Sequence, residues 1–269
     1  MPDVQWIAAY LSLGLFVGFF SGLLGIGGGL IMVPVLAYLF EVQHVSQENT
    51  LHLALGTSMA TILFTSVFSA YQHHMHRAVN WDAFRYITPG ILLGTGIGAI
   101  VVSHVPTHWL TIFFVLFVYF AAVQMWAGFK PEATRDYPTR TGVTIAGMVI
   151  GSISSLVSIG GGVLSVPYLV WHKQPLRYAI ATSAALGFPI ALGGTAGYIA
   201  NGMISGNGLP PNSLGYVYLP VLMWLVIGTM ITAPVGAKTT HRVPVNTLKK
   251  VFAVFLFLLA SKMLFRLFA

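Results

Sequence analysis

Long stretches with few charged residues most constrain what this chain can fold into. A run of about 18 or more apolar residues is typical of a membrane-spanning helix, and only 7% of the 269 residues are charged, which leaves too little polar sequence for a separate soluble domain. The chain is therefore predicted to be an all-α polytopic membrane protein with a single membrane domain over residues 1–269. Its apolar runs are 6–40, 53–72, 86–103, 109–129, 141–171, 178–200, 214–237 and 251–269.

Two of these runs are too long for one crossing. The 35 residues of run 6–40 would form a helix about 52 Å long, whereas the hydrocarbon core of a membrane is about 30 Å thick. Adjacent glycines are poor residues for a helix interior and tolerate the backbone angles of a turn. We therefore predict a break at residues 25–29, and a second break at 158–162 within run 141–171.

The two breaks belong to an internal duplication. Residues 17–36 and 150–169 are identical at ten of twenty aligned positions, including the Ile-Gly-Gly-Gly tetrad and a Val-Pro pair. Thr57-Ser58 matches Thr182-Ser183, and segment 98–110 matches 236–248. The sequence predicts two repeats, at approximately 4–129 and 141–269.

The distribution of Lys and Arg predicts how the repeats cross the membrane. Eight straight crossings would leave six of the 13 basic residues in the odd-numbered loops and seven elsewhere, without the cytoplasmic excess that membrane proteins have. If each long run folds back at its glycines, each half has four main helices and a half-helix or re-entrant segment, and the second half is inverted. Eleven basic residues then share one side, and both termini lie outside. The two exceptions are Lys262 and Arg266.

The glycine breaks are the best candidates for a substrate site. A half-helix that begins inside the membrane directs its unpaired N–H groups and positive dipole end toward the break, which favours an anion. The alternative is that the glycines serve close helix packing. The candidate residues are Gly27, Gly28, Gly29, Gly160, Gly161 and Gly162.

Hydroxyl groups follow each break in the next helix. Thr57, Ser58, Thr182 and Ser183 are predicted to donate hydrogen bonds to the bound anion without adding charge. The competing interpretation is a hydrogen bond from each hydroxyl to the carbonyl four residues earlier, which is common in membrane helices.

Other chemistries have weaker support. All six acidic residues lie in loops or near the ends of runs, so none is available deep in the membrane to relay protons or bind a cation. His52, near the start of a run, is a possible proton carrier or a structural residue. His73, His74 and His76 keep a metal-ion transporter or a His-metal membrane enzyme as alternatives, but no cysteine or nearby acid supports a metal site.

The duplicated motif resembles the TauE/SafE family of sulfite and organosulfur-anion exporters. The matching positions are 25–34, 158–167, Thr57-Ser58 and Thr182-Ser183, with Ser158 in the second copy where the first has Gly25. The resemblance implies a permease of the bacterial inner membrane that exports sulfite, a sulfonate or a related small anion. It implies no enzymatic activity and no cofactor. The expected partners are the small anionic substrate and the lipid bilayer, and the net charge of +7 follows from membrane topology rather than from binding of nucleic acid.

Overall fold

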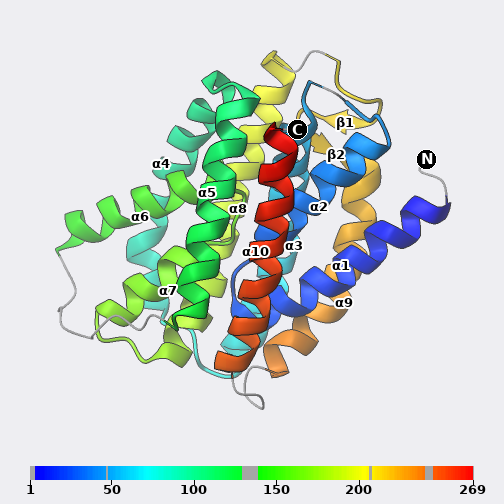
Figure 1. Cartoon of the computed structure of the whole chain (residues 1–269). Helices are drawn as coiled ribbons and strands as arrows, with labels where there is room; N and C mark the ends of the chain where they lie inside the picture. Colours follow the sequence, from blue (N-terminus) through cyan, green and yellow to red (C-terminus); the bar gives the residue numbers. More distant parts are fainter. Residues whose placement is uncertain (1–3, 47, 129–138, 206–207, 240–244, 269) are drawn as a thin grey trace.

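The structure is a computed structural model that describes residues 4–46, 48–128, 139–205, 208–239 and 245–268 as a bundle of helices (Figure 1). The first half contains α1 (Val4–Leu24), α2 (Gly29–Val42), α3 (Thr50–Met75), α4 (Trp81–His104) and α5 (Thr107–Trp126). The second half contains α6 (Arg140–Leu156), α7 (Gly162–Trp171), α8 (Leu176–Ser205), α9 (Leu219–Thr239) and α10 (Val245–Phe268). A hairpin of β1 (Ser213–Leu214) and β2 (Val217–Tyr218) precedes α9.

Both predicted helix breaks are present. α1 ends at Leu24 and α2 begins at Gly29, while α6 ends at Leu156 and α7 begins at Gly162. The short helices α2 and α7 have 14 and 10 residues. At about 1.5 Å per residue they are about 21 Å and 15 Å long, too short to cross a core of about 30 Å. The prediction of one broken helix in each half is confirmed.

The helices pack in pairs that combine the two halves of the chain. α3 lies against α8 and α5 against α10, while α1 packs along α9 and α6 packs along α4 (Figure 1). Each short helix packs on the long helix that follows it, α2 on α3 and α7 on α8. If α1 to α5 are matched in order with α6 to α10, each packed pair corresponds to another pair in the set or to itself. The packing of the two halves is therefore symmetric.

Small residues allow the pairs α1–α9 and α4–α6 to pack closely. A Cβ added at Gly22 would lie 2.0 Å from the Ala233 carbonyl oxygen, and one added at Gly94 would lie 2.0 Å from the Met148 carbonyl oxygen. Inside a membrane, helix association gains little from the hydrophobic effect and depends on such close van der Waals contact. These glycines therefore position the long tilted helices α1 and α6, at whose ends the two breaks lie.

The outer surface of the bundle is apolar, as expected for contact with lipid. Six of the described helices are long and apolar enough to cross a membrane. Large side chains on them point outward: Ile100, Leu116 and Met223 are 63%, 62% and 63% exposed. The predicted all-α polytopic membrane fold is confirmed.

Run 214–237 was predicted as one membrane segment, and the structure corrects this boundary. Residues 213–218 form the hairpin, and α9 begins only at Leu219. The turn contains Gly215 at φ 54°, a left-handed angle that glycine adopts without strain. The Tyr216 N–H donates to the Tyr198 carbonyl oxygen at 3.2 Å, so the extended segment is fastened to α8 instead of continuing as helix.

The described loops gather at two ends of the bundle. At one end, Ser46 donates from Oγ to the Gly208 carbonyl oxygen at 3.4 Å, which joins the loop after α2 to the segment before β1. The start of α5 and the last turns of α10 line a cavity there. At the other end, Lys249 of α10 lines a cavity with the end of α5 and the start of α8. We call these the hairpin end and the Lys249 end.

Candidate functional site

The two glycine breaks lie against each other in the middle of the molecule. The Gly160 N–H donates to the Ile26 carbonyl oxygen at 3.0 Å, a direct hydrogen bond between the breaks. A Cβ on Gly29 would lie 1.6 Å from the Ser158 carbonyl oxygen, and one on Gly162 would lie 2.4 Å from that of Gly25. Backbone atoms of each break therefore fill the space that side chains would need in the other.

Positive φ angles fix the course of both breaks. Gly28 and Gly161, which cap α2 and α7, have φ angles of 79° and 81°. Ser158 takes a φ of 50° where the first break has Gly25 at 68°. A non-glycine residue in this region is strained, and here the Ser158 hydroxyl donates to the Leu55 carbonyl oxygen at 2.9 Å, which holds the residue in place. The departure from the glycine motif therefore preserves the turn.

Buried backbone donors begin both short helices. Among the described residues, no acceptor is present for the N–H groups of Gly29 and Leu30 in α2 or of Gly162 and Val163 in α7. All four residues are buried. Buried N–H groups almost always have a partner, and the positive end of a helix dipole points the same way. Both short helices therefore begin with buried N–H groups that lack an acceptor, at the positive end of the helix dipole.

Serine hydroxyls without partners add to these donors. Ser58 and Ser183 are 0% exposed, and their hydroxyl groups have no hydrogen-bond partner in the described structure. The Ser58 Oγ lies 3.3 Å from the position that a Cβ on Gly29 would take. Ser183 lies on α8 between Ile180 and Ala184, which both approach Gly25. Ser58 therefore lies beside the first break, and Ser183 lies on the part of α8 that approaches the same break.

Ser165 is a further buried hydroxyl that the sequence did not indicate. It lies in the first turns of α7, has no hydrogen-bond partner among the described residues, and its Oγ is 2.9 Å from where a Cβ on Gly161 would be. The aligned residue in the first repeat is Met32. Comparison of the repeats therefore gave no signal for it.

Thr57 and Thr182 have a different role from the neighbouring serines. The Thr57 Oγ1 accepts the Tyr218 N–H at 3.0 Å, and the Thr182 Oγ1 accepts the Asn80 N–H at 2.9 Å. Asn80 and Tyr218 are the residues directly before α4 and α9. Each threonine oxygen therefore fastens the start of a helix from the opposite half of the chain, rather than bonding to its own helix.

Because the threonine hydroxyls have hydrogen-bond partners and the serine hydroxyls have none, their removal is expected to affect the stability of the fold differently. Thr57→Val or Thr182→Val leaves a part-buried N–H without its acceptor and is expected to cost about 1–3 kcal/mol of unfolding free energy. Ser58→Ala or Ser183→Ala removes a hydroxyl that has no partner, so the change is expected to be near zero or stabilising. Unfolding of the purified variants in detergent measures both. Equal losses in all four variants would contradict the assignment.

The histidines lie away from the breaks. His52 is 7% exposed, and its ring packs against Tyr216 of the hairpin with the centroids 5.0 Å apart. It precedes Ser58 by six residues, about 9 Å along α3. His74 Nδ1 accepts the Trp81 indole N–H at 3.2 Å. No group of three or more His, Asp or Glu side chains in the described part of the chain could hold a metal ion.

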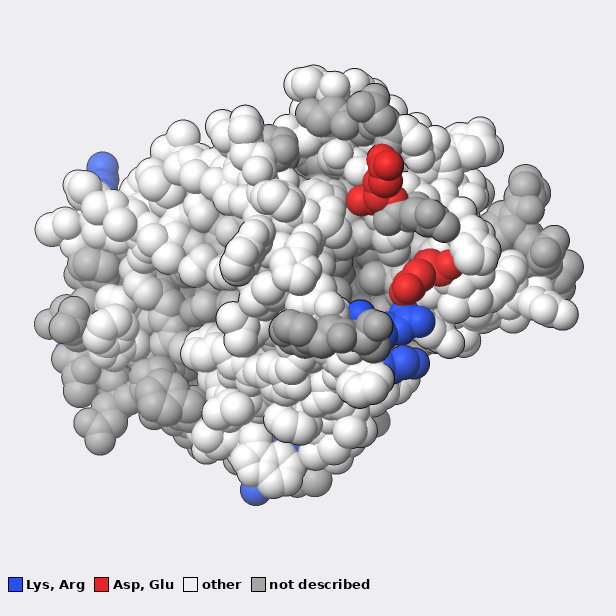
Figure 2. Space-filling view, turned by 45° about the horizontal axis from the view of Figure 1, so that its top comes forward, with Lys and Arg blue, Asp and Glu red and all other residues white. Residues whose placement is uncertain are grey.

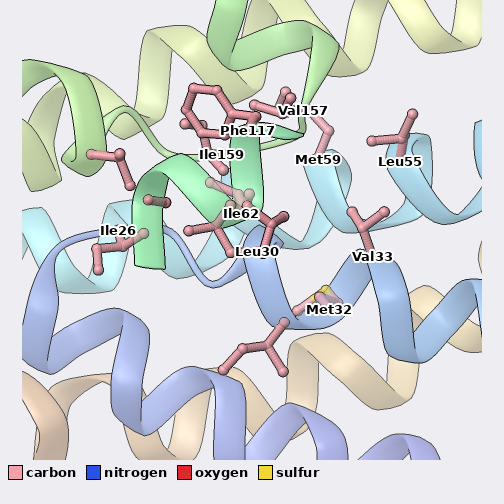
Figure 3. Close-up of a cluster of buried hydrophobic side chains, with 14 of the residues drawn as sticks. Ile26, Leu30, Met32, Val33, Leu55, Met59, Ile62, Phe117, Val157 and Ile159 are labelled. Carbon is pink, nitrogen blue, oxygen red and sulfur yellow. The ribbon is translucent and has the colours of Figure 1, made fainter. Parts of the chain in front are cut away.

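Apolar side chains enclose the crossing of the breaks. Figure 3 shows Ile26, Leu30, Ile62, Val157 and Ile159 gathered where the two breaks meet α3. In such surroundings an uncompensated charge is costly and an electrostatic interaction is strong. The unpartnered donors are therefore placed where they would discriminate most strongly for an anion over a cation.

A cavity lies at each end of the bundle, and equivalent elements of the two halves form the two cavities. A cavity of about 150 Å³ at the Lys249 end reaches Ile26, Gly162 and Val163 at the start of α7. A cavity of about 560 Å³ at the hairpin end lies between α2, the start of α3, α5 and the last turns of α10. The smaller cavity is thus lined both by Lys249 and by the two residues whose N–H groups begin α7.

Comparison with known proteins decides the family. A family model described as sulfite exporter TauE/SafE matches residues 10–263. The chain belongs to the TauE/SafE sulfite exporter family. This TauE/SafE protein is accordingly a multi-pass transporter embedded in the lipid bilayer.

Relatives of this TauE/SafE protein come from bacteria and an archaeon. A Haemophilus influenzae protein named as a probable membrane transporter is 37% identical over 96% of this chain and 98% of its own length. Similarly named proteins from Bacillus subtilis (YunE) and Methanocaldococcus jannaschii are 27% and 26% identical, over 94% and 87% of this chain and 95% and 86% of their own. No solved structure matches the chain.

Proposed function

We propose that this transporter is a carrier, not an enzyme, that exports a small sulfur-containing anion such as sulfite or a sulfonate. The observation that carries the proposal is the cavity of about 150 Å³ lined by Gly162 and Val163, the two residues of α7 whose buried N–H groups have no acceptor among the described residues. In the proposal the anion occupies the breaks, and Ser58 and Ser183 donate to it while Thr57 and Thr182 hold the surrounding helices.

The charges of the described residues agree with an anionic substrate. Glu41, Glu48 and Asp82 are the acidic residues that the structure describes, and all three lie at or beyond helix ends. Asp3, Glu132 and Asp136 lie outside the described residues. None of the three lies at the breaks, so no described acidic side chain there would repel an anion or bind a cation.

The arrangement of the two ends supports inverted repeats and access to the site from alternate sides. The hairpin-end cavity is formed by α2, α3, α5 and α10, and the Lys249-end cavity by their counterparts α7, α8, α10 and α5. In carriers with inverted repeats, exchange between two such conformations opens a central site first to one side and then to the other. We propose that the breaks are that site, that the Lys249 end is cytoplasmic, and that both termini lie outside.

The membrane potential is expected to drive efflux. Export of one negative charge from a cell that is negative inside gains about 2.3 kcal/mol per 100 mV. In proteoliposomes loaded with sulfite, an inside-negative potassium diffusion potential should accelerate efflux and an inside-positive potential should slow it. His52→Gln should have little effect. Efflux that ignores the potential, follows a proton gradient and stops in His52→Gln would instead assign proton coupling to His52.

The same assay tests the proposed site. Hydrogen bonds to charged groups contribute about 1.5–3 kcal/mol, so Ser58→Ala and Ser183→Ala are expected to slow efflux about tenfold or more while unfolding as the parent does. Ser12→Ala is the matched control, because Ser12 is exposed on α1 and bonds to the Ala9 carbonyl oxygen. Parental rates in both buried-serine variants would exclude the breaks as the binding site.

A further inference from the structure

The cavity at the hairpin end is much larger than a small inorganic anion such as sulfite. Its volume is about 560 Å³, within the range of about 300–1,000 Å³ that pockets for organic ligands have. Figure 2 shows basic and acidic groups side by side at the edge of a hollow on this face of the molecule. The cavity lies beyond Pro34 on α2, farther from the breaks than the smaller cavity.

Two basic residues line this cavity. They are the two that the predicted topology places on the opposite side of the membrane from the other eleven. They are Lys262 and Arg266, one turn apart on α10. The Tyr38 ring of α2 lies under both: Lys262 Nζ is 4.1 Å from its centroid, and the Arg266 guanidinium carbon is 4.7 Å from it. Cation–π contact with one ring therefore holds two positive groups together at the wall of the cavity.

Only part of this positive charge is compensated. Arg266 donates from Nη1 to Glu41 Oε2 at 2.5 Å. Lys262 has no acidic partner among the described residues. His44 is the remaining titratable side chain with a basic group in the lining. The cavity thus has an excess of one positive charge, next to an arginine that a second anion could share with Glu41.

The rest of the lining offers few hydrogen-bond donors. Among its hydroxyls, Thr50 already donates to the Ser46 carbonyl oxygen, Ser46 to that of Gly208, and Thr111 to that of Thr107. The remaining wall is largely apolar and includes Val35, Leu51, Leu259, Met263 and Leu267. In this cavity, a small inorganic oxyanion would pair with the basic groups on one side only. The rest of its polar surface would face apolar side chains without hydrogen bonds, which costs free energy.

We propose that this cavity is a binding site for an organic anion that has a compact anionic group and a short apolar body, such as an alkanesulfonate. The anionic group lies between Lys262 and Arg266, and the apolar body lies against Leu259 and Met263. Binding here follows from the cavity itself, and the statement that such an anion is also cargo rests on the proposed function. The site then selects organic sulfonates over sulfite or sulfate at the hairpin end.

Calorimetric titration of the purified protein with methanesulfonate, ethanesulfonate, butanesulfonate and sulfate tests the site. Affinity is expected to rise about fourfold for each added methylene, the value for burial of one CH₂, and sulfate should bind weakest. Lys262→Gln should weaken butanesulfonate binding about tenfold or more. Glu41→Gln should strengthen it, because a competing carboxylate is removed. Lys250→Gln is the matched control, since Lys250 lies over the Trp126 ring near the other end of α10.

Several outcomes would overturn the proposal. If the affinity for alkanesulfonates does not depend on the length of the alkyl chain, or if Lys262→Gln leaves the dissociation constant unchanged, the anion does not bind in this cavity. Binding in detergent that disappears in nanodiscs containing phosphatidylglycerol would assign the cavity to an anionic lipid. Butanesulfonate that fails to bind while sulfite efflux continues defeats this inference alone, whereas binding without any anion flux defeats the proposed function alone.

Discussion

Alanine at Gly29 is expected to prevent the chain from reaching its native packing, the largest effect that we expect from any single methyl group in this protein. The new Cβ would lie 1.6 Å from the Ser158 carbonyl oxygen, and both partners are backbone, so no side chain can rotate away. Overpacking in a core commonly costs about 1–3 kcal/mol, and we expect a loss above about 3 kcal/mol here. Size-exclusion profiles and unfolding midpoints in detergent measure it.

Two further glycines make this experiment specific. Gly162→Ala places its Cβ 2.4 Å from the Gly25 carbonyl oxygen and should also be strongly destabilising. Gly96→Ala on α4 meets nothing within 4 Å and should be neutral or stabilising by up to about 1 kcal/mol, because alanine is the better helix former. If Gly29→Ala behaved like Gly96→Ala, the two breaks would not be in contact.

Cysteines at Thr139 and Gln174 are expected to react with a membrane-impermeant maleimide from the same side of the membrane. The parent chain has no cysteine, so each label reports a single position. Between the two positions lie α6 of 17 residues, the second break and α7 of 10 residues. With a break between them, the chain enters the membrane along α6 and returns along α7.

A cysteine at Glu48, in the loop after α2, serves as the control for the other side of the membrane. The inverted arrangement places it on the other side, so the reagent that labels Thr139→Cys should leave Glu48→Cys unlabelled until the membrane is permeabilised. Labelling of Thr139→Cys and Gln174→Cys from opposite sides would contradict inverted repeats. It would also remove the reason to place a substrate site at the breaks.

The membrane fold and both break positions were predictable because they depend on local properties. An apolar run longer than the hydrocarbon core must break or fold back, and adjacent glycines supply the angles for it. The motif around residues 25–34 and its copy at 158–167 also indicated the family. The hairpin at 213–218 was missed because it continues an apolar run, and its extended form is set by contacts with Tyr198 and Thr57.

The partners of each side chain could not be predicted, because they come from distant parts of the chain. Thr57 and Ser58 are neighbours and were assigned the same role, yet the Thr57 oxygen is occupied by a backbone N–H 161 residues away while Ser58 has no partner. Which of two adjacent hydroxyls meets a helix start depends on how α3 is rotated against α9 and the hairpin. No periodicity in the sequence specifies that rotation.

By itself, the sequence determined that this protein lies in a membrane, where its helices break, and to which family it belongs, because hydrophobicity and backbone freedom are properties of each segment. The tertiary structure alone decided that the two breaks fill each other's space, that four buried N–H groups remain unpaired beside unpartnered serines, and that Lys262 and Arg266 meet at one tyrosine ring. These features arise where segments from opposite halves of the chain pack together, and close packing between distant residues is a property of the whole fold.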